Sequence, residues 1–236
     1  MANQYYLVPN AAGTAFTGTG VTPDGTFPDG VILCTQAQAQ NFQAYIPDMS
    51  TTPPSVVSAP STQLLAQAQA AQISSLEQSW AKALAVVPVT INGTNYQIDN
   101  SPARQTYNIS QAMSMQTIMA QAPAWTASTP VVSGTYCKLN GVYLYCSTSG
   151  KTAASAPTPP TTFGIPVTDG TAAWELLGRH IWLTNGTMQL FTPQEVLNGA
   201  MQIEAYIHQQ NLILSGLKEQ VNAATTVAAV QAVVWP

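Results

Sequence analysis

Three Asn-Gly dipeptides, at residues 92–93, 140–141 and 185–186, stand between stretches in which apolar and polar residues alternate. Alternation with a period of two is typical of β-strands, and Asn-Gly readily adopts the two positive φ angles of a tight two-residue turn. Each of these dipeptides therefore predicts a β-hairpin. The chain must fold into an architecture that contains three local antiparallel strand pairs.

Two of the predicted hairpins lead directly into predicted helices. After the first hairpin, Ser101-Pro102 provides an N-cap and a first-turn proline for a helix that ends near Gln121. After the hairpin over 181–191, Thr192-Pro193-Gln194-Glu195 matches a capping box and opens a helix of about 30 residues. Helical spacing of apolar residues also predicts helices over 62–86 and, more briefly, over 226–235.

Residues 1–60 have a different composition, rich in Gly, Pro, Thr and Asn. A segment of this kind buries little apolar surface by itself, so we expect an extended arm that becomes ordered on docking to partner subunits. Within it, Thr35 is the expected cap of a short helix over residues 36–45.

Residues 123–179 interrupt the repeated hairpin and helix pattern and predict a separate small β module. In its central hairpin a two-residue Asn140-Gly141 turn pairs Cys137 with Leu144, which fixes the side-chain parity. One face then carries Cys137, Leu139, Val142, Leu144 and Cys146. The opposite face carries Tyr136, Lys138, Tyr143 and Tyr145, and this aromatic face is the candidate contact surface.

Flat rings on a rigid sheet suit three roles. We favour packing of the aromatic face against the protein's own helical body or a neighbouring subunit. Contact with a host-surface glycan and plain exposure are the alternatives. Cys137 and Cys146 are expected to be buried thiols, because the turn does not place them opposite each other.

The sequence thus predicts an α+β fold in three parts. These parts are an extended arm over 1–60, a helix and hairpin body over 61–122 and 180–236, and an inserted β module over 123–179. The two hairpin and helix units of the body are expected to pack together with the helix over 62–86.

Only 7% of the residues are charged, and the formal net charge is −4. Without a basic surface, binding to nucleic acid is not expected. No secretion signal or membrane span is recognised. His180 and His208 lack metal-ligand spacing, and nucleophile and phosphate-loop motifs are absent, so we expect no enzyme activity, metal or cofactor. A chain with so few charges and large apolar residues is expected to form a homo-oligomer or permanent partner contacts.

Several motifs resemble proteins of tailed bacteriophages. The segment Pro28-Asp29-Gly30-Val31, the run Ala66–Ile73, the Val-Thr-Ile-Asn-Gly hairpin and the end Val221–Val230 resemble a family linked to tail-fibre and tail-assembly proteins, with an uncharacterised C-terminal domain. The match covers about residues 28–122 and 180–236. The ending Val167-Thr168-Asp169-Gly170-Thr171-Ala172-Ala173-Trp174 is similar to that of a small β module of phage virion proteins.

The resemblance implies a non-enzymatic structural component of a tailed-phage virion, associated with the tail or a fibre and made in the bacterial cytoplasm. Its partners would be other virion proteins, and contact with a host-surface glycan is a further expectation because related modules are described as carbohydrate-binding. A tail-fibre assembly chaperone and a capsid decoration protein are the alternatives. The inserted module departs from the usual pattern of the family, which weakens the chaperone alternative.

Overall fold

The computed structural model describes residues 3–236 and has a mixed α+β fold with antiparallel sheets, which confirms the predicted fold class. It contains two compact units, Met1–Leu76 with Gly216–Pro236, and Glu77–Ser215. This division passes through the two longest helices, α2 (Ser61–Ala85) and α4 (Pro193–Ala223), so it differs from the predicted division into arm, body and module.

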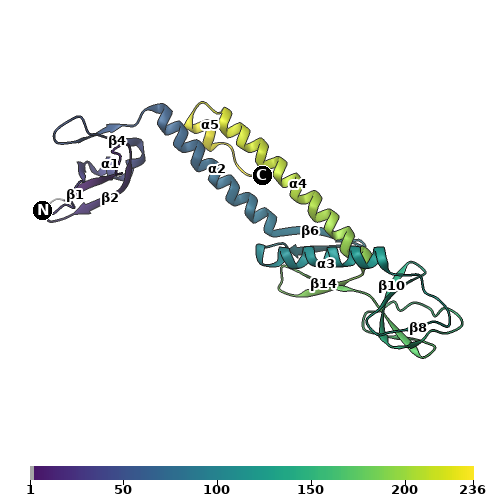
Figure 1. The fold of residues 1–236 in the computed structure, drawn as a ribbon. Helices are drawn as coiled ribbons and strands as arrows, with labels where there is room; N and C mark the ends of the chain where they lie inside the picture. The colour runs from purple at the N-terminus through teal and green to yellow at the C-terminus, as the bar shows by residue number, and fades with distance from the viewer. Residues whose placement is uncertain (1–2) are drawn as a thin grey trace. The chain divides into compact units, whose positions relative to one another are not determined.

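The first unit begins with a three-stranded antiparallel sheet in the order β2-β1-β3 (Figure 1). Its strands are β1 (Gln4–Pro9), β2 (Phe16–Thr22) and β3 (Ile32–Cys34). Helix α1 (Gln36–Gln40), a 3-10 turn (Phe42–Ala44) and the hairpin of β4 (Tyr45–Asp48) and β5 (Ser55–Ser58) follow. Thr35 is the N-cap of α1, as predicted, and forms a capping box with Gln38. The helix ends at Gln40, five residues earlier than predicted.

The expected extended arm is wrong for the described part of residues 1–60. Leu7, Phe16, Ile32 and Ala39 form a buried cluster of their own. These residues are far apart in the sequence, so the composition of the segment did not reveal that they meet. In the same sheet, the ring of Tyr6 on β1 lies directly over Gly20 on β2. A Cβ at residue 20 would overlap this ring, so the contact requires glycine.

Helical residues complete the first unit. Leu76 of α2, Val221 of α4 and Val230 of α5 (Val227–Gln231) are buried. The Gln69 Nε2 donates to the carbonyls of Val221 and Ala224, at 3.1 and 3.3 Å. Because the last carbonyls of a helix have no partner within it, this amide stabilises the end of α4.

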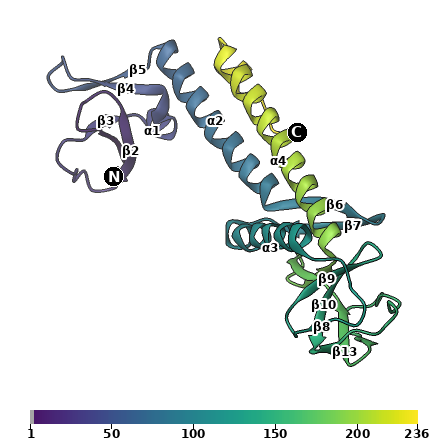
Figure 2. The same ribbon diagram turned by 45° about the vertical axis from the view of Figure 1, so that its right-hand side comes forward.

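Two hairpins and α3 (Pro102–Gln121) form the body of the second unit (Figure 2). The first hairpin consists of β6 (Val86–Ile91) and β7 (Thr94–Asp99), and the second of β14 (Arg179–Trp182) and β15 (Met188–Phe191). An antiparallel bridge between Ile98 and Leu183 joins the hairpins. Alternation in β6 directs Val87, Val89 and Ile91 into the core.

The turns of these hairpins differ. Asn92 and Gly93 have φ angles of 51° and 78°, as the predicted two-residue turn requires. In the second hairpin, the Leu183 amide donates to the Thr187 carbonyl at 2.9 Å and encloses a three-residue loop, so the two-residue turn predicted there is wrong. The reason is local: the Asn185 Oδ1 accepts hydrogen bonds from the amide and hydroxyl of Thr187, and only Gly186 has a positive φ.

The capping box before α4 is confirmed, because Glu195 Oε2 accepts from the Thr192 amide and the Thr192 hydroxyl accepts from the Glu195 amide. Ser101 precedes α3 without a capping hydrogen bond from its side chain. The last helix is shorter than predicted, and Thr226 caps it through the Ala229 amide.

The inserted module contains a four-stranded antiparallel sheet in the order β12-β13-β10-β9, with a separate pair formed by β8 and β11. Its strands are β8 (Pro130–Val131), β9 (Tyr136–Leu139), β10 (Val142–Thr148), β11 (Gly150–Lys151), β12 (Val167–Asp169) and β13 (Ala172–Leu176). Leu139 pairs with Val142 across the Asn140-Gly141 turn, and Cys137 pairs with Leu144. The predicted register is therefore confirmed.

Replacing Gly216 with alanine should stabilise the protein by about 0.5–1 kcal/mol, because glycine is costly within a helix and a Cβ there meets no atom within 4 Å. Gly20→Ala is the contrasting control and should destabilise it, since the new Cβ collides with Tyr6. Urea unfolding followed by far-ultraviolet circular dichroism measures both changes. Destabilisation by Gly216→Ala would contradict the prediction.

Candidate functional site

The histidines and acidic residues form no evident reactive centre in the part of the chain that the structure describes. Across residues 3–236, no group of three or more His, Cys, Asp or Glu side chains could hold a metal ion. His180 lies on β14 and His208 on α4, and both side chains are exposed. None of the helices within residues 3–236 is long and apolar enough to cross a membrane.

The aromatic face of the module is covered by the body of the same unit. Tyr143 is only 8% exposed and belongs to the core cluster that includes Val87, Met115 and Phe191. Tyr136 and Tyr145 are half-buried against that cluster and face each other across the strands, with ring centroids 5.9 Å apart. The favoured interpretation allowed packing against the protein's own helical body or a neighbouring subunit, and in the structure these rings pack against the body of the same unit.

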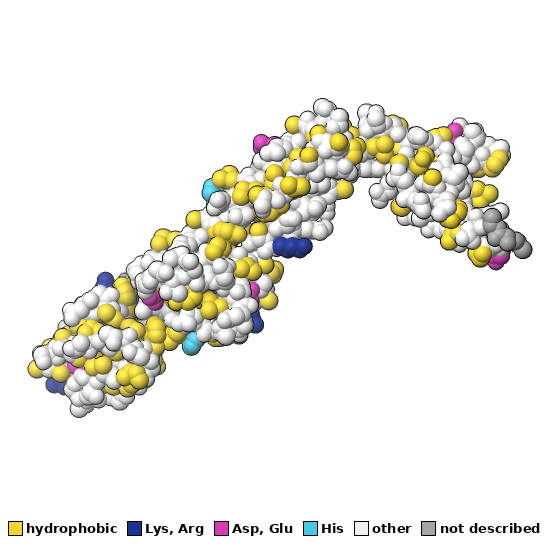
Figure 3. Space-filling model, turned by 180° about the vertical axis from the view of Figure 1, so that it is seen from behind, with side chains coloured by type: hydrophobic (Ala, Val, Ile, Leu, Met, Phe, Trp, Pro, Cys, Tyr) yellow, Lys and Arg dark blue, Asp and Glu magenta, His cyan; other side chains and the backbone are white. Residues whose placement is uncertain are grey.

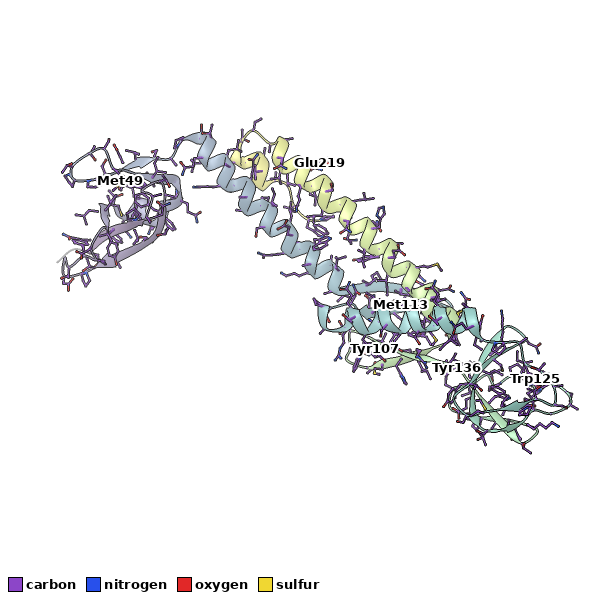
Figure 4. The ribbon with its side chains drawn as sticks, viewed as in Figure 1. Met49, Tyr107, Met113, Trp125, Tyr136 and Glu219 are labelled. Atoms are coloured by element: carbon purple, nitrogen blue, oxygen red, sulfur yellow. The ribbon has the colours of Figure 1, made fainter. Side chains whose placement is uncertain are left out.

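This arrangement removes the aromatic face as an open contact surface. Lys138 is the one member of the four candidates that is exposed, and its Nζ lies 5.3 Å from the centroid of the Tyr143 ring. The amide of Leu177, the residue directly after β13, donates to the Tyr143 carbonyl at 3.0 Å. This hydrogen bond holds the end of β13 at the same core. Figure 4 shows Tyr136 near the junction with α3 and Trp125 within the module.

The opposite face of the module forms a second core, as the parity predicted. Cys137, Leu139, Leu144, Cys146 and Trp174 are buried together. Burial, aided by the negative charge of Asp169 and by Cys146, raises the pKa of the Cys137 thiol to about 12. At neutral pH this thiol is protonated and a poor nucleophile. Both cysteines of the module are free and buried, as expected.

Asp169 is the polar centre of the module. It is 1% exposed, and its Oδ2 accepts hydrogen bonds from the indole nitrogens of Trp125 and Trp174, at 2.7 and 2.8 Å. Its Oδ1 accepts from the Ala153 amide at 2.8 Å. Three donors thus compensate the buried carboxylate, which links the start of the module, its long loop and β13.

An open apolar groove of about 550 Å³ lies between α3 and the N-terminal part of α4. The β6 residues Val89 and Ile91 contribute to its lining. Ile109 and Met113 of α3 and Met201 of α4 also line it, and they are 52%, 62% and 61% exposed. Apolar side chains dominate the lining, so the groove is suited to binding another apolar surface.

Few polar groups enter this groove. Glu195 is engaged in the capping box and also accepts from the Asn92 side chain. Asn108 is buried in the wall, where its Nδ2 donates to the Asp99 carbonyl at 2.9 Å and its Oδ1 has no hydrogen-bond partner. Within residues 3–236, the exposed side chains of Gln116 and Glu204 make no hydrogen bond to another residue.

Neither the role of Asp169 as a buried hydrogen-bond acceptor nor the groove was predicted from the sequence. For Asp169 a signal existed, because the residue ends strand β12 directly before the two-residue Gly170-Thr171 turn and stands five residues before Trp174. The groove had no comparable signal, since its two walls come from helices that are about 90 residues apart in the chain.

Comparisons with protein-family models, with curated proteins and with solved structures find no match to this chain.

The position of Tyr143 in the shared core leads to a stability prediction. Tyr143→Ala should lower the free energy of unfolding by about 3–5 kcal/mol, because it leaves a cavity where the module meets the body. Lys138→Ala, directly opposite on β9, is the control and should change it by less than about 0.5 kcal/mol. Urea unfolding measures both variants. Equal, small effects would show that the ring is not in the core.

Removing the buried carboxylate should be equally damaging. Asp169→Ala leaves two indole N–H groups and one amide without an acceptor, so we expect a loss of about 3–5 kcal/mol. Asp169→Asn retains one acceptor oxygen and should lose less. Thr168→Ala, at an exposed position of the same strand, is the matched control. Tryptophan fluorescence during urea unfolding reports the result, and a neutral Asp169→Ala would refute the role assigned to the carboxylate.

Proposed function

We propose that this protein is a non-enzymatic structural component of a tailed-phage virion, associated with the tail or a fibre, where it attaches other virion subunits. The proposal rests on the resemblance of its sequence motifs to phage tail and virion proteins. One structural observation carries it: Asp169 and Trp174 of the resembling Val167–Trp174 segment lie at the centre of the hydrogen bonds and of the buried core of the module.

The contacts of this segment support the resemblance residue by residue. Asp169 accepts from both indoles, and Trp174 fills the module core. Gly170 has a φ of 66° and lies so close to the Lys151 carbonyl that a Cβ would overlap it. The Thr171 hydroxyl accepts from the Lys151 amide at 2.8 Å. A segment with such demands is expected wherever the same module fold occurs, which supports the proposal.

The surface also suits a subunit of an assembly. Charged side chains are sparse on the face seen in Figure 3, which agrees with a chain that is 7% charged. A soluble monomer commonly carries a quarter or more of charged surface residues. A surface with few charges causes little electrostatic repulsion when neighbouring subunits come into close contact.

The proposal does not include glycan binding through Tyr136, Tyr143 and Tyr145. Those rings pack against the body of the same unit, so a sugar cannot stack on them without separating the module from the body. Attachment of subunits therefore has to use other surfaces.

Mass spectrometry of purified virions of the encoding phage tests the proposal. We expect the chain in the particle at a constant copy number relative to the tail proteins, with immunogold label on the tail. Its absence from particles would overturn the structural role and favour a fibre-assembly chaperone. Label on the head would favour a capsid decoration protein.

Complementation supplies a sharper version of the test. A phage that lacks the gene should regain infectivity with the wild-type chain or Thr168→Ala, and not with Asp169→Ala, whose module is destabilised. Rescue by Asp169→Ala to the wild-type level would show that the module is dispensable for the proposed role.

A further inference from the structure

Helix α3 has an unusually uncharged exposed surface. Of its 20 residues only Arg104 is charged, and the guanidinium of Arg104 lies 3.8 Å from the centroid of the Trp182 ring. Only Asn108 and Met115 of α3 are buried. A helix at the surface of a globular protein normally presents charged and polar residues to water. Besides its uncharged polar residues, α3 exposes Ile109 and Met113, which line the groove between α3 and α4.

We propose that this groove, together with the exposed ridge that Ile109 and Met113 form along its α3 wall, is the interface with a second copy of the chain. The inference is independent of the proposed virion function. In a two-fold interface the same patch must fit itself, so it needs a projecting part and a hollow part side by side. The ridge on α3 and the groove beside it provide both. Met113 of each copy enters the groove of the other.

The position of the ridge along α3 fits this symmetry. Ile109 and Met113 lie on either side of the middle of the helix, which runs from Pro102 to Gln121. If the α3 helices of the two copies pack antiparallel, with the two-fold axis near the middle of each helix, they are in contact along their full length of about 30 Å. This arrangement also places the two copies of Arg104 near opposite ends of the pair, where they do not repel each other at close range.

The polar groups at the groove are complementary between copies. Gln116 offers amide donors from α3, and Glu204 offers a carboxylate acceptor from α4. Neither side chain has a hydrogen-bond partner among residues 3–236. In a two-fold pair, Gln116 of one copy donates to Glu204 of the other, and the contact occurs twice.

A second copy explains the rim better than a small ligand does. A molecule that fills the floor of the groove leaves Ile109, Met113 and Met201 in contact with water. A helix laid along the groove covers all three. Methionine side chains adapt to irregular apolar contacts, which suits an interface made by the same side chain from both copies.

Sedimentation equilibrium over a range of concentrations tests the interface with the full chain. We expect a dimer, and Met113→Glu should weaken its dissociation constant by at least about tenfold, because the carboxylate is placed in an apolar contact. Val132→Glu is the matched control: Val132 is 64% exposed on the module and outside the groove, so dimerisation should not change. Circular dichroism checks that both variants are folded.

Cross-linking locates the contact. In a Cys34→Ser background, Met113→Cys should form covalent dimers with a short bis-maleimide, because the two copies of residue 113 lie near the axis. Val132→Cys should not. A protein that remains monomeric up to about 1 mM would overturn the proposal. So would a dimer that Met113→Glu leaves unchanged, since self-association would then use a different surface.

Discussion

The shared core of the Glu77–Ser215 unit depends on Tyr143, because this ring belongs to the module and is buried among side chains of the body. Val87, Met115 and Phe191 reach the same cluster from β6, α3 and β15. The ring of Tyr96 meets Phe191 edge-on at 5.0 Å and extends the aromatic contact. Since large aromatic rings contribute much of the buried area in a small core, the position of the module is fixed by apolar contact.

Amide side chains make several of the tertiary contacts that charged residues make in other proteins. Gln202 of α4 accepts from the Thr90 amide and donates to the Thr90 carbonyl, at 2.9 Å in each case, so it pairs with β6 as a strand would. Gln69 only donates, through its Nε2, to the carbonyls of Val221 and Ala224 at the end of α4. Contacts of this kind do not weaken in salt, and they let a chain with few charges hold long helices in place.

Turn and capping motifs in the sequence predicted most hairpins and helices, but they carry no information on contacts between residues that are distant in the chain. The Asn140-Gly141 turn fixed the parity of the module hairpin, so the contents of both faces followed from the sequence. The Asn185-Gly186 dipeptide gave the hairpin but not its loop, because the Asn185 side chain bonds to Thr187. The N-terminal sheet escaped prediction since its core joins Leu7, Phe16 and Ile32 across 25 residues. The Asn140-Gly141 turn also fixed which side chains share the aromatic face, whereas the covering of that face depends on residues from β6, β7, α3, β14, β15 and α4.

The two cores of the module explain why it should unfold together with the body. Its inner core around Trp174 and Asp169 is self-contained, while the reverse side of the same β10 strand contributes Tyr143 to the body. Detaching the module would therefore expose Tyr143 and, at the same time, the body residues that it covers. Loss of the inner core would remove the strand that positions the ring. Because either event opens the shared core that contains Tyr143, unfolding of the module is coupled to unfolding of the body, and this coupling follows from the alternation of side chains along one strand.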